Sequence, residues 1–388
     1  MSLVQRTMEN LERRRQKVLS GGINSIPPPF KRFSNDFIGL EPAKMYVVTA
    51  ATKVGKTTFA SYLFIYNSLL YAYNNPDKVR FKVFYIPREE TPEDVLHRFM
   101  CYILYKLSKG KVIVDRNDLK SSKNVALDEK VLELLNSEEY KSILDFFEEN
   151  VMFYPSVNPS GVWKEMIKYA EDHGKVYKRK IETKDEFGCE KEIEVFDHYV
   201  PDDDNEIRLI FDDHVSLTPL ERNFTLKQAI DKLGEYYVLL RNMYGYSICE
   251  VHQQNTSSES LDAIKLGKAK ASTNFLADSS YSGRNCDVCI GVNSPFRQEL
   301  PDWNGYDITK LKDYFRYVEI LLNRSGSAGG VAPLFYLGKV CDWNEMPLPK
   351  EVAKLNEVYS YVDFLNDVSK PKSFFIYKLK KTVKNLFK

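Results

Sequence analysis

The sequence lacks any apolar run of the ~18 residues that a membrane-spanning helix needs. Its first residues, MSLVQRTMENLERRR, also lack the apolar core of a secretory signal. We therefore expect a cytoplasmic protein with no membrane span.

Cysteine is scarce as well, with six residues in a chain of 388, at positions 101, 189, 249, 286, 289 and 341. Cys286 and Cys289 form a C-x-x-C spacing, but no second pair supplies a zinc site. Both lie in the apolar run CDVCIGV, which favours buried strand thiols over redox or metal chemistry. This cysteine usage indicates a reducing compartment.

The two signs of charge are nearly balanced, with 55 Lys and Arg residues against 54 Asp and Glu residues and a net charge of +1. Any surface that binds an anionic partner must therefore be local. Internal repeats and low-complexity tracts are missing too. Contents of 43% hydrophobic and 28% charged residues are typical of a globular chain with a sizeable core.

Strand-like and helix-like patterns alternate from Met45 to Gln253. Apolar strand patterns occupy residues 45–50, 79–87, 208–213 and 246–254. Helical patterns separate them, which predicts an α/β fold with a mainly parallel sheet and helices on both faces. Further strands are expected at 286–293, 317–324 and 333–339, whereas residues 108–150 look helical with less clarity and 255–285 look like loop.

Two segments stand outside this alternation. Residues 3–19 form a charged amphipathic pattern that ends at Gly21-Gly22, which predicts a helix. A proline-stiffened connector, 23–33, follows it. Residues 175–200 alternate along two arms around a polar turn that contains glycine, which predicts a β-hairpin.

The segment TAATKVGKTTF resembles a phosphate-binding loop between an expected strand and an expected helix. In such a loop the backbone N–H groups face the phosphates, and Gly55 permits their close approach. Lys56 would reach the β- and γ-phosphates of ATP, and the Thr57 hydroxyl would hold Mg²⁺. We assign Ala50 and Thr58 to the same ATP site, although Ala50 stands where the motif has its first glycine. The alternative is an ordinary glycine-containing turn before a helix.

Two acidic pairs follow strands that would end beside this loop. Asp213 ends the strand RLIFDD and could hold Mg²⁺ through its water shell; the alternative for Asp212 or Asp213 is a solvated strand end. Glu89 or Glu90 follows another strand, where a carboxylate could orient the attacking water. Helix N-terminal charge is the alternative for this second pair.

In this order the segments resemble the ATPase domain of DnaB-type replicative helicases, a RecA-like P-loop fold. The loop of that family commonly begins with alanine, and Ala50 resembles the family in this respect. The resemblance implies that Glu90 is the catalytic glutamate, because Pro92 and Leu96 fall at matching offsets. It also implies that Asp213 is the metal-binding aspartate, since FDDHVSL is similar to the family's Walker B segment.

The resemblance continues downstream. Gln253, in HQQN, corresponds to the residue that links the γ-phosphate to the DNA loops, although a polar strand end is the alternative. Arg324, in Arg-Ser-Gly, corresponds to the arginine finger for a neighbouring subunit's ATP, and both residues are expected to be catalytic. The residues that we expect to bind DNA are Lys265, Lys268 and Lys270 in the loop that follows Gln253, with Arg222 and Lys227 as additions. The alternative is that the loop lysines only solvate a mobile loop.

Several features depart from the family pattern. Leu322 replaces a lysine two positions before Arg324, so one γ-phosphate contact would be missing. The hairpin is an apparent insertion, and the family's N-terminal helical domain is not found. These departures would suit a phage or plasmid protein, acting in the host cytoplasm. The domains that we expect are a linker-like helix at 1–22, a RecA-like ATPase domain at 23–345 with the insertion at about 175–205, and a C-terminal extension with a basic tail at 346–388.

The resemblance implies an ATP-dependent DNA helicase of the DnaB type. It would form a homo-hexameric ring that uses ATP and Mg²⁺ to translocate on single-stranded DNA in replication, with replication proteins as possible partners. One alternative is a RecA-like ATPase that loads or moves nucleic acid without unwinding it, or that acts in recombination. Another is an ATP-binding scaffold with slow turnover, which Leu322 favours. The basic tail could bind single strands, a protein or an anionic surface, or pack on the core.

Overall fold

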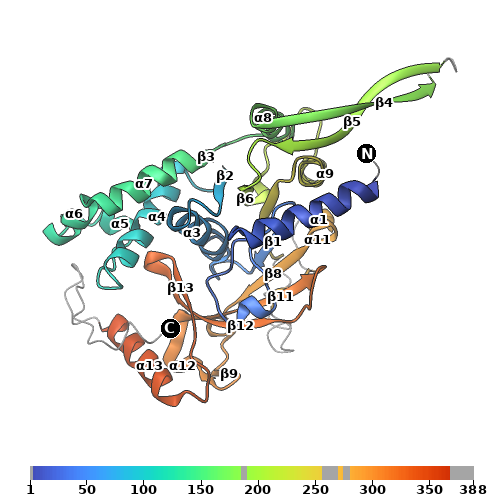
Figure 1. Cartoon of the computed structure of the whole chain (residues 1–388). Helices are drawn as coiled ribbons and strands as arrows, with labels where there is room; N and C mark the ends of the chain where they lie inside the picture. The colour runs from blue at the N-terminus through green and yellow to red at the C-terminus, as the bar shows by residue number, and fades with distance from the viewer. Residues whose placement is uncertain (1–2, 185–189, 256–269, 274–279, 368–388) are drawn as a thin grey trace.

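The computed structural model describes residues 3–184, 190–255, 270–273 and 280–367. A nine-stranded sheet forms its centre, in the order β13-β12-β11-β8-β1-β7-β6-β2-β3 (Figure 1). The strands of this sheet are β1 (Met45–Ala50), β2 (Arg80–Pro87), β3 (Val151–Phe153), β6 (Glu206–Asp213), β7 (Ser247–Gln253), β8 (Val288–Asn293), β11 (Phe315–Asn323), β12 (Val331–Leu337) and β13 (Asp342–Glu345). Two short strands, β9 (Asp302–Trp303) and β10 (Tyr306–Asp307), pair with each other outside it.

The run from β8 through β1, β7, β6 and β2 to β3 is parallel throughout. β11, β12 and β13 extend the β8 edge in antiparallel pairs. The predicted α/β fold with a mainly parallel sheet is therefore confirmed. Because parallel strands place their C-terminal ends at one edge, the ends of β1, β2, β6 and β7 meet there.

Helices cover both faces of the sheet (Figure 1). Val48 and Ala50 of β1 belong to the apolar cluster under the helices that follow β1 and β2, whereas Met45 and Val47 belong to the cluster under α8 and α9. This alternation follows from the two-residue period of a strand buried on both faces. The helices are α1 (Leu3–Leu19), α2 (Lys56–Ala60), α3 (Asn67–Asn74), α4 (Pro92–Leu107), α5 (Arg116–Leu119), α6 (Glu129–Leu135), α7 (Glu138–Asn150), α8 (Pro159–Asp172), α9 (Leu226–Tyr244), α11 (Ser280–Asn285), α12 (Ile308–Leu311) and α13 (Val352–Asn366).

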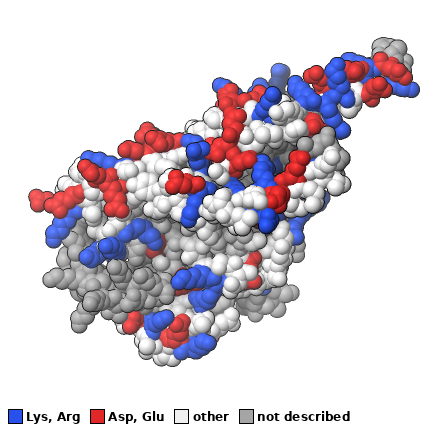
Figure 2. Space-filling view, in the orientation of Figure 1, with Lys and Arg blue, Asp and Glu red and all other residues white. Residues whose placement is uncertain are grey.

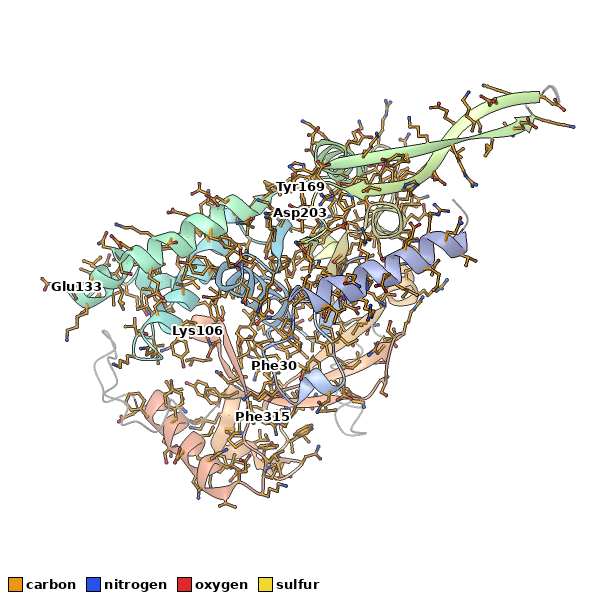
Figure 3. All side chains as sticks on the ribbon, in the orientation of Figure 1. Phe30, Lys106, Glu133, Tyr169, Asp203 and Phe315 are labelled. Carbon is orange, nitrogen blue, oxygen red and sulfur yellow. The ribbon has the colours of Figure 1, made fainter. Side chains whose placement is uncertain are left out.

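The helix behind the phosphate loop is continuous, because a π-helical stretch, Ser61–Tyr66, joins α2 to α3. The N-terminal connector packs on it: the ring of Phe30 stacks on Phe59 and Tyr62, with centroids 6.3 and 5.7 Å away. Figure 3 labels Phe30 near the middle of the view, and its side chain is buried. The connector therefore packs against the helix that follows the phosphate loop and stabilises its position.

The expected hairpin is present as β4 (Gly174–Lys184) and β5 (Glu190–Pro201), paired along their whole lengths. It projects from the body of the molecule (Figure 1), and charges of both signs line it (Figure 2). Its base is anchored, because the Tyr199 hydroxyl donates a hydrogen bond of 2.9 Å to the Ala170 carbonyl and its ring packs on Tyr244. Away from that base most of its side chains are exposed or half-buried.

The expected N-terminal helix is also present, as α1. Arg13 holds it to the turn after the hairpin through an ion pair of 2.8 Å with Asp204. Its apolar residues Val4, Met8 and Leu11 are nevertheless 71%, 62% and 58% exposed. α1 therefore presents an apolar stripe to its surroundings.

The segment 108–150 is helical only in α5, α6 and α7, and polar loops separate these helices. Other expectations stay open. Lys265, Lys268 and the tail 368–388 lie outside the described residues, and the domain boundaries remain predictions. Within the described part of the chain, no helix combines the length and the apolar character that crossing a membrane requires.

Candidate functional site

The loop between β1 and α2 needs glycine at position 55. Gly55 has φ 105°, in the left-handed region that side chains avoid. A Cβ there would also lie 3.2 Å from the Thr58 hydroxyl and 3.4 Å from the Tyr336 ring. Glycine therefore allows the chain to turn at position 55 into α2, which begins with Lys56 and Thr57. Ala50, the last residue of β1, is fully buried beneath the loop.

A buried arginine supports this loop from the antiparallel side of the sheet. Arg316, on β11, donates a hydrogen bond of 2.8 Å from Nε to the Val54 carbonyl. Its guanidinium also binds Asp313 at 2.9 Å and lies over the Tyr336 ring, 5.3 Å from the centroid. Burial lowers the pKa of Arg316. Arg316 thereby fixes the loop to β11.

Thr57 and Asp213 come together at the edge where the parallel strands end. The Thr57 hydroxyl donates a hydrogen bond of 3.0 Å to Asp213 Oδ1. Burial raises the pKa of the Asp213 carboxyl to about 6. A hydroxyl and a carboxylate oxygen are the hard ligands that Mg²⁺ prefers, so this pair fits a magnesium ion beside bound phosphates.

Asp212 faces the opposite side of β6. Its two carboxylate oxygens accept hydrogen bonds from Arg88, at 2.6 and 2.8 Å, and one of them also accepts from the Tyr237 hydroxyl at 2.6 Å. It is fully buried in this network. Asp212 is therefore occupied by structural partners, while Asp213 faces the phosphate loop.

Glu89 and Glu90 both line the cavity above the loop, but they differ in their partners. Glu90 Oε1 accepts a hydrogen bond of 2.8 Å from Arg116, and its other oxygen contacts the guanidinium of Arg98. Glu89 is 58% exposed, and its Oε2 lies 3.7 Å from His214 Nε2. The structure brings both glutamates to the site, Glu90 in an ion-paired state.

Gln253 ends β7, the strand next to β1. Its side-chain amide donates a hydrogen bond of 2.8 Å to the Thr52 hydroxyl in the phosphate loop. The parallel register places Gln253 beside Ala50. A displacement of the phosphate loop would therefore be transmitted through this hydrogen bond to the end of β7, where the chain leaves the sheet.

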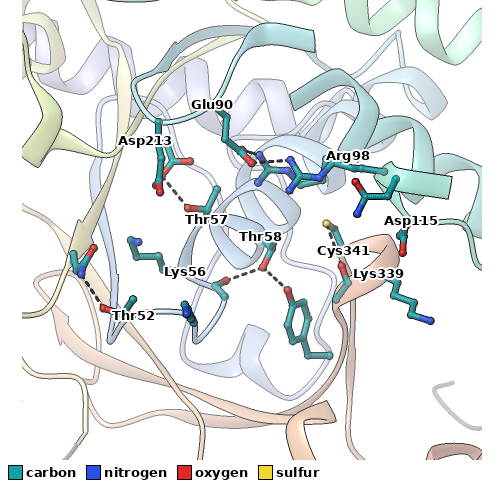
Figure 4. A pocket seen from close by; sticks show the side chains of 18 residues that line it. Thr52, Lys56, Thr57, Thr58, Glu90, Arg98, Asp115, Asp213, Lys339 and Cys341 are labelled. Atoms are coloured by element: carbon teal, nitrogen blue, oxygen red, sulfur yellow. Dashed lines mark hydrogen bonds and ion pairs between the residues drawn. The ribbon is translucent and has the colours of Figure 1, made fainter. Parts of the chain in front are cut away.

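One cavity of about 610 Å³ is lined by the following predicted residues: Gly55, Lys56, Thr57, Thr58, Glu89, Glu90, Asp213 and Gln253. This volume lies within the ~300–1,000 Å³ that small-molecule sites occupy. Figure 4 shows Lys56, Thr57 and Asp213 on one side and Asp115, Lys339 and Cys341 on the other. The cavity thus extends from the phosphate loop to a second wall, built by α5 and by the turn between β12 and β13.

Arg324, Arg222 and Lys270, which the structure describes, do not line this cavity. Arg324 follows β11; its backbone N–H donates a hydrogen bond of 2.9 Å to the Asp287 carbonyl, and its guanidinium contacts the Arg284 carbonyl. Arg222 is exposed in the turn before α9. Lys270 is exposed too, with Nζ 3.6 Å from Glu319, while Lys265 and Lys268 fall in the segment that the structure does not describe.

Sequence reasoning missed several residues of the second wall and of the supports. Arg98 lines the cavity from α4, but Glu90 precedes the Thr91 N-cap of this helix, so helical spacing does not link the two residues. No local pattern marks Arg116, Tyr336 or Arg316, which reach the site through chain connections of 26 to 278 residues.

No protein-family model matches the sequence, and no curated protein matches it. Solved structures do match the fold. One that is described as an ATPase domain is 12% identical and has a TM-score of 0.58, over 86% of this chain and 96% of that one. A DnaB-like replicative helicase, described together with its interactions with primase, is 11% identical with a TM-score of 0.58, over 88% of this chain and 66% of that one. The chain therefore has the RecA-like fold of the ATPase domains of DnaB-like replicative helicases.

Proposed function

We propose that this chain is an ATP-hydrolysing motor of the replicative helicase type. The observation that carries the proposal is the Thr57–Asp213 hydrogen bond of 3.0 Å at the N-terminus of α2, next to Lys56. A glycine-containing loop, a lysine, a hydroxyl and a strand-end carboxylate are the parts that P-loop enzymes use for Mg-ATP. The fold shared with DnaB-like ATPase domains supports the same assignment.

Each side chain then has a task in hydrolysis. Lys56 and the backbone N–H groups of the loop would bind the phosphates, while Thr57 and Asp213 would hold a Mg²⁺ ion. That ion would supply charge neutralisation at the phosphates. Glu90 orients the attacking water, which requires its carboxylate to be released from at least one of its two arginine partners.

Gln253 connects the site to the segment that follows β7. Its hydrogen bond to Thr52 makes the position of this strand end depend on the phosphate loop. We propose that Lys265, Lys268 and Lys270, in that segment, together with Arg222, bind the phosphates of single-stranded DNA. A local set of cations suits a chain whose net charge is only +1.

We propose a ring of six subunits, as the resemblance to DnaB-type helicases implies, and two observations support contacts between the subunits. Arg324 lies outside its own chain's cavity, as a residue that serves a neighbour's ATP would. The exposed apolar stripe of α1 is the kind of surface that another subunit covers. Replication proteins are the partners that such a ring would meet, in the cytoplasm or, for a phage protein, the host cytoplasm.

The test measures ATP hydrolysis by the full chain with Mg²⁺, with and without single-stranded DNA, alongside native mass and strand displacement on a forked duplex. We expect hydrolysis that DNA stimulates, a hexameric mass, and displacement that stops in Lys56→Ala. Absence of hydrolysis under every condition, from a folded protein that binds DNA, would contradict the motor.

A second candidate is an ATP-dependent assembly protein with slow turnover. Leu322 favours it, because this residue packs with the apolar cluster of α8 and α9 and offers no cation to a phosphate. In that case nucleotide would drive assembly, while the hydrolysis rate would stay low with and without DNA. The hydrolysis assay therefore separates the two candidates, as does strand displacement, which the assembly protein would not perform.

A further inference from the structure

Glu90 is held by two arginines from different parts of the chain. Arg116 Nη1, on α5, donates a hydrogen bond of 2.8 Å to Glu90 Oε1, and Arg98, on α4, contacts the other carboxylate oxygen. All three side chains line the nucleotide-sized cavity. Figure 4 shows the Glu90 carboxylate turned toward Arg98. A carboxylate in this state has both oxygens engaged by cations.

The two arginines differ in their freedom to move. The Arg98 side chain is 4% exposed and belongs to a helix of four turns that packs on the core. The Arg116 side chain is 42% exposed and belongs to a helix of only four residues, in the polar segment between α4 and α6. Arg98 is therefore a fixed partner of Glu90, and Arg116 is the partner that can leave.

We propose that Arg116 exchanges partners when nucleotide binds, leaving Glu90 for the terminal phosphate of a nucleoside triphosphate. This proposal rests on the proposed function and adds a positioning residue to the same site. A residue that orients the attacking water must face the terminal phosphate, and Arg116 already contacts that residue. A phosphate group offers the guanidinium fork a more highly charged partner than one carboxylate does.

The exchange has a consequence for turnover. While Arg116 binds Glu90, its guanidinium occupies one acceptor position of Oε1 and its positive charge weakens the carboxylate as an acceptor for water. Departure of Arg116 toward the phosphate removes that contact, so Glu90 becomes a stronger acceptor for the attacking water only in a loaded site. Arg116 thus couples the presence of the terminal phosphate to the hydrogen bonding of Glu90. It does so from α5, which is not part of the phosphate-loop motif.

A double-mutant cycle on nucleotide binding tests this exchange. Binding of a non-hydrolysable ATP analogue with Mg²⁺ is measured for the full chain, Glu90→Gln, Arg116→Gln and the double variant. Loss of the competing carboxylate should tighten binding in Glu90→Gln, because Arg116 no longer has to leave a partner. In the Arg116→Gln background the same change should have little effect, so we expect a coupling of about fivefold or more. Arg116→Lys should retain part of this coupling, since it keeps the charge without the fork.

Lys120→Gln is the matched control, because Lys120 follows α5 and pairs with Asp94 away from Glu90. It should leave binding unchanged, and thermal unfolding should show that every variant is folded. Equal tightening by Glu90→Gln in both Arg116 backgrounds would show simple repulsion between Glu90 and phosphate, and would overturn the exchange. If that happens while Lys56→Ala still abolishes binding, only the exchange fails. If the wild-type chain binds no analogue, the proposed function and the exchange fail together.

Discussion

Thr57 and Asp213 lie 156 positions apart in the sequence and are joined by a hydrogen bond of 3.0 Å. The fold produces this meeting, because β1 and β6 are parallel and only β7 separates them. Thr57 is the second residue of the helix after β1, and Asp213 ends β6. A phosphate-binding helix end and a carboxylate therefore share one corner of the cavity, and the site can be probed from either side.

Lys56→Ala should abolish ATP hydrolysis while the fold is retained. Lys56 lies at the N-terminus of α2 and lines the cavity, so its loss removes the cation from the phosphate site without opening the core. Hydrolysis and thermal unfolding are measured side by side, with Lys78→Ala as control, because Lys78 is exposed in the turn before β2. Undiminished hydrolysis by folded Lys56→Ala would rule out this nucleotide site.

Glu90→Gln should hydrolyse ATP about 10²–10⁴-fold more slowly than the wild type, the usual loss for a general base or water-orienting group. Nucleotide binding should survive. Glu89→Gln is the matched control and should be much milder, since Glu89 is 58% exposed beside His214. Single-turnover rates with prebound ATP measure the chemical step directly. The opposite ranking of the two variants would assign the water-orienting role to Glu89.

Asp213 predicts a pH dependence of stability in the absence of Mg²⁺. Burial raises its pKa from 3.8 to about 6, so between these pH values the folded state holds a proton that the unfolded state has lost. The free energy of unfolding should therefore fall as pH rises through this window and level off above it. Asp213→Asn should remove this slope and be more stable at pH 8, by about 2–3 kcal/mol at 1.36 kcal/mol per pKa unit.

Chemical denaturation at pH 5 and pH 8 in a chelator measures this effect, with Asp77→Asn, an exposed change, as control. With Mg²⁺ and nucleotide the ranking should reverse, because the wild type alone keeps the metal carboxylate and gains stability from the ligand. Identical pH slopes for the wild type and Asp213→Asn would contradict the role of the buried carboxyl.

The sequence predicted those parts of the fold and site that depend on local pattern. Apolar runs followed by polar ends located β1, β2, β6 and β7, and strict alternation located the hairpin. The choice between Asp212 and Asp213 could not be made locally, because it depends on Arg88, 124 positions away, and on Tyr237.

Other features depend on contacts between distant segments, which no local pattern encodes. Arg116 meets Glu90 only because α5 folds back over the cavity. The sequence of β11 does not indicate that Arg316 donates a hydrogen bond to the Val54 carbonyl of the phosphate loop. The antiparallel order of β11, β12 and β13 likewise follows from pairing at the β8 edge, which residue composition does not determine.

Catalysis should require a neighbouring subunit, through Arg324. This arginine lies beside Arg284 and Asp287, outside its own cavity, so any contact with ATP must be made to another copy. Arginine fingers contribute about 10³–10⁵ in rate where they have been measured in other enzymes. Arg324→Ala should therefore assemble and bind ATP but hydrolyse it very slowly, and Lys44→Ala, which removes a surface lysine bound to Ser325, is its matched control.

Mixing two inactive variants tests whether the arginine acts across an interface. Lys56→Ala subunits lack a working phosphate loop but still offer Arg324, and Arg324→Ala subunits have the reverse defect. Mixed rings should regain hydrolysis wherever an intact loop meets an intact arginine, and the activity should follow the mixing ratio. Deletion of residues 3–19 should weaken the rings, because the exposed stripe of α1 would no longer be available to a neighbour. If co-assembled variants regain nothing, Arg324 does not act in trans, and the proposed ring mechanism loses its main support.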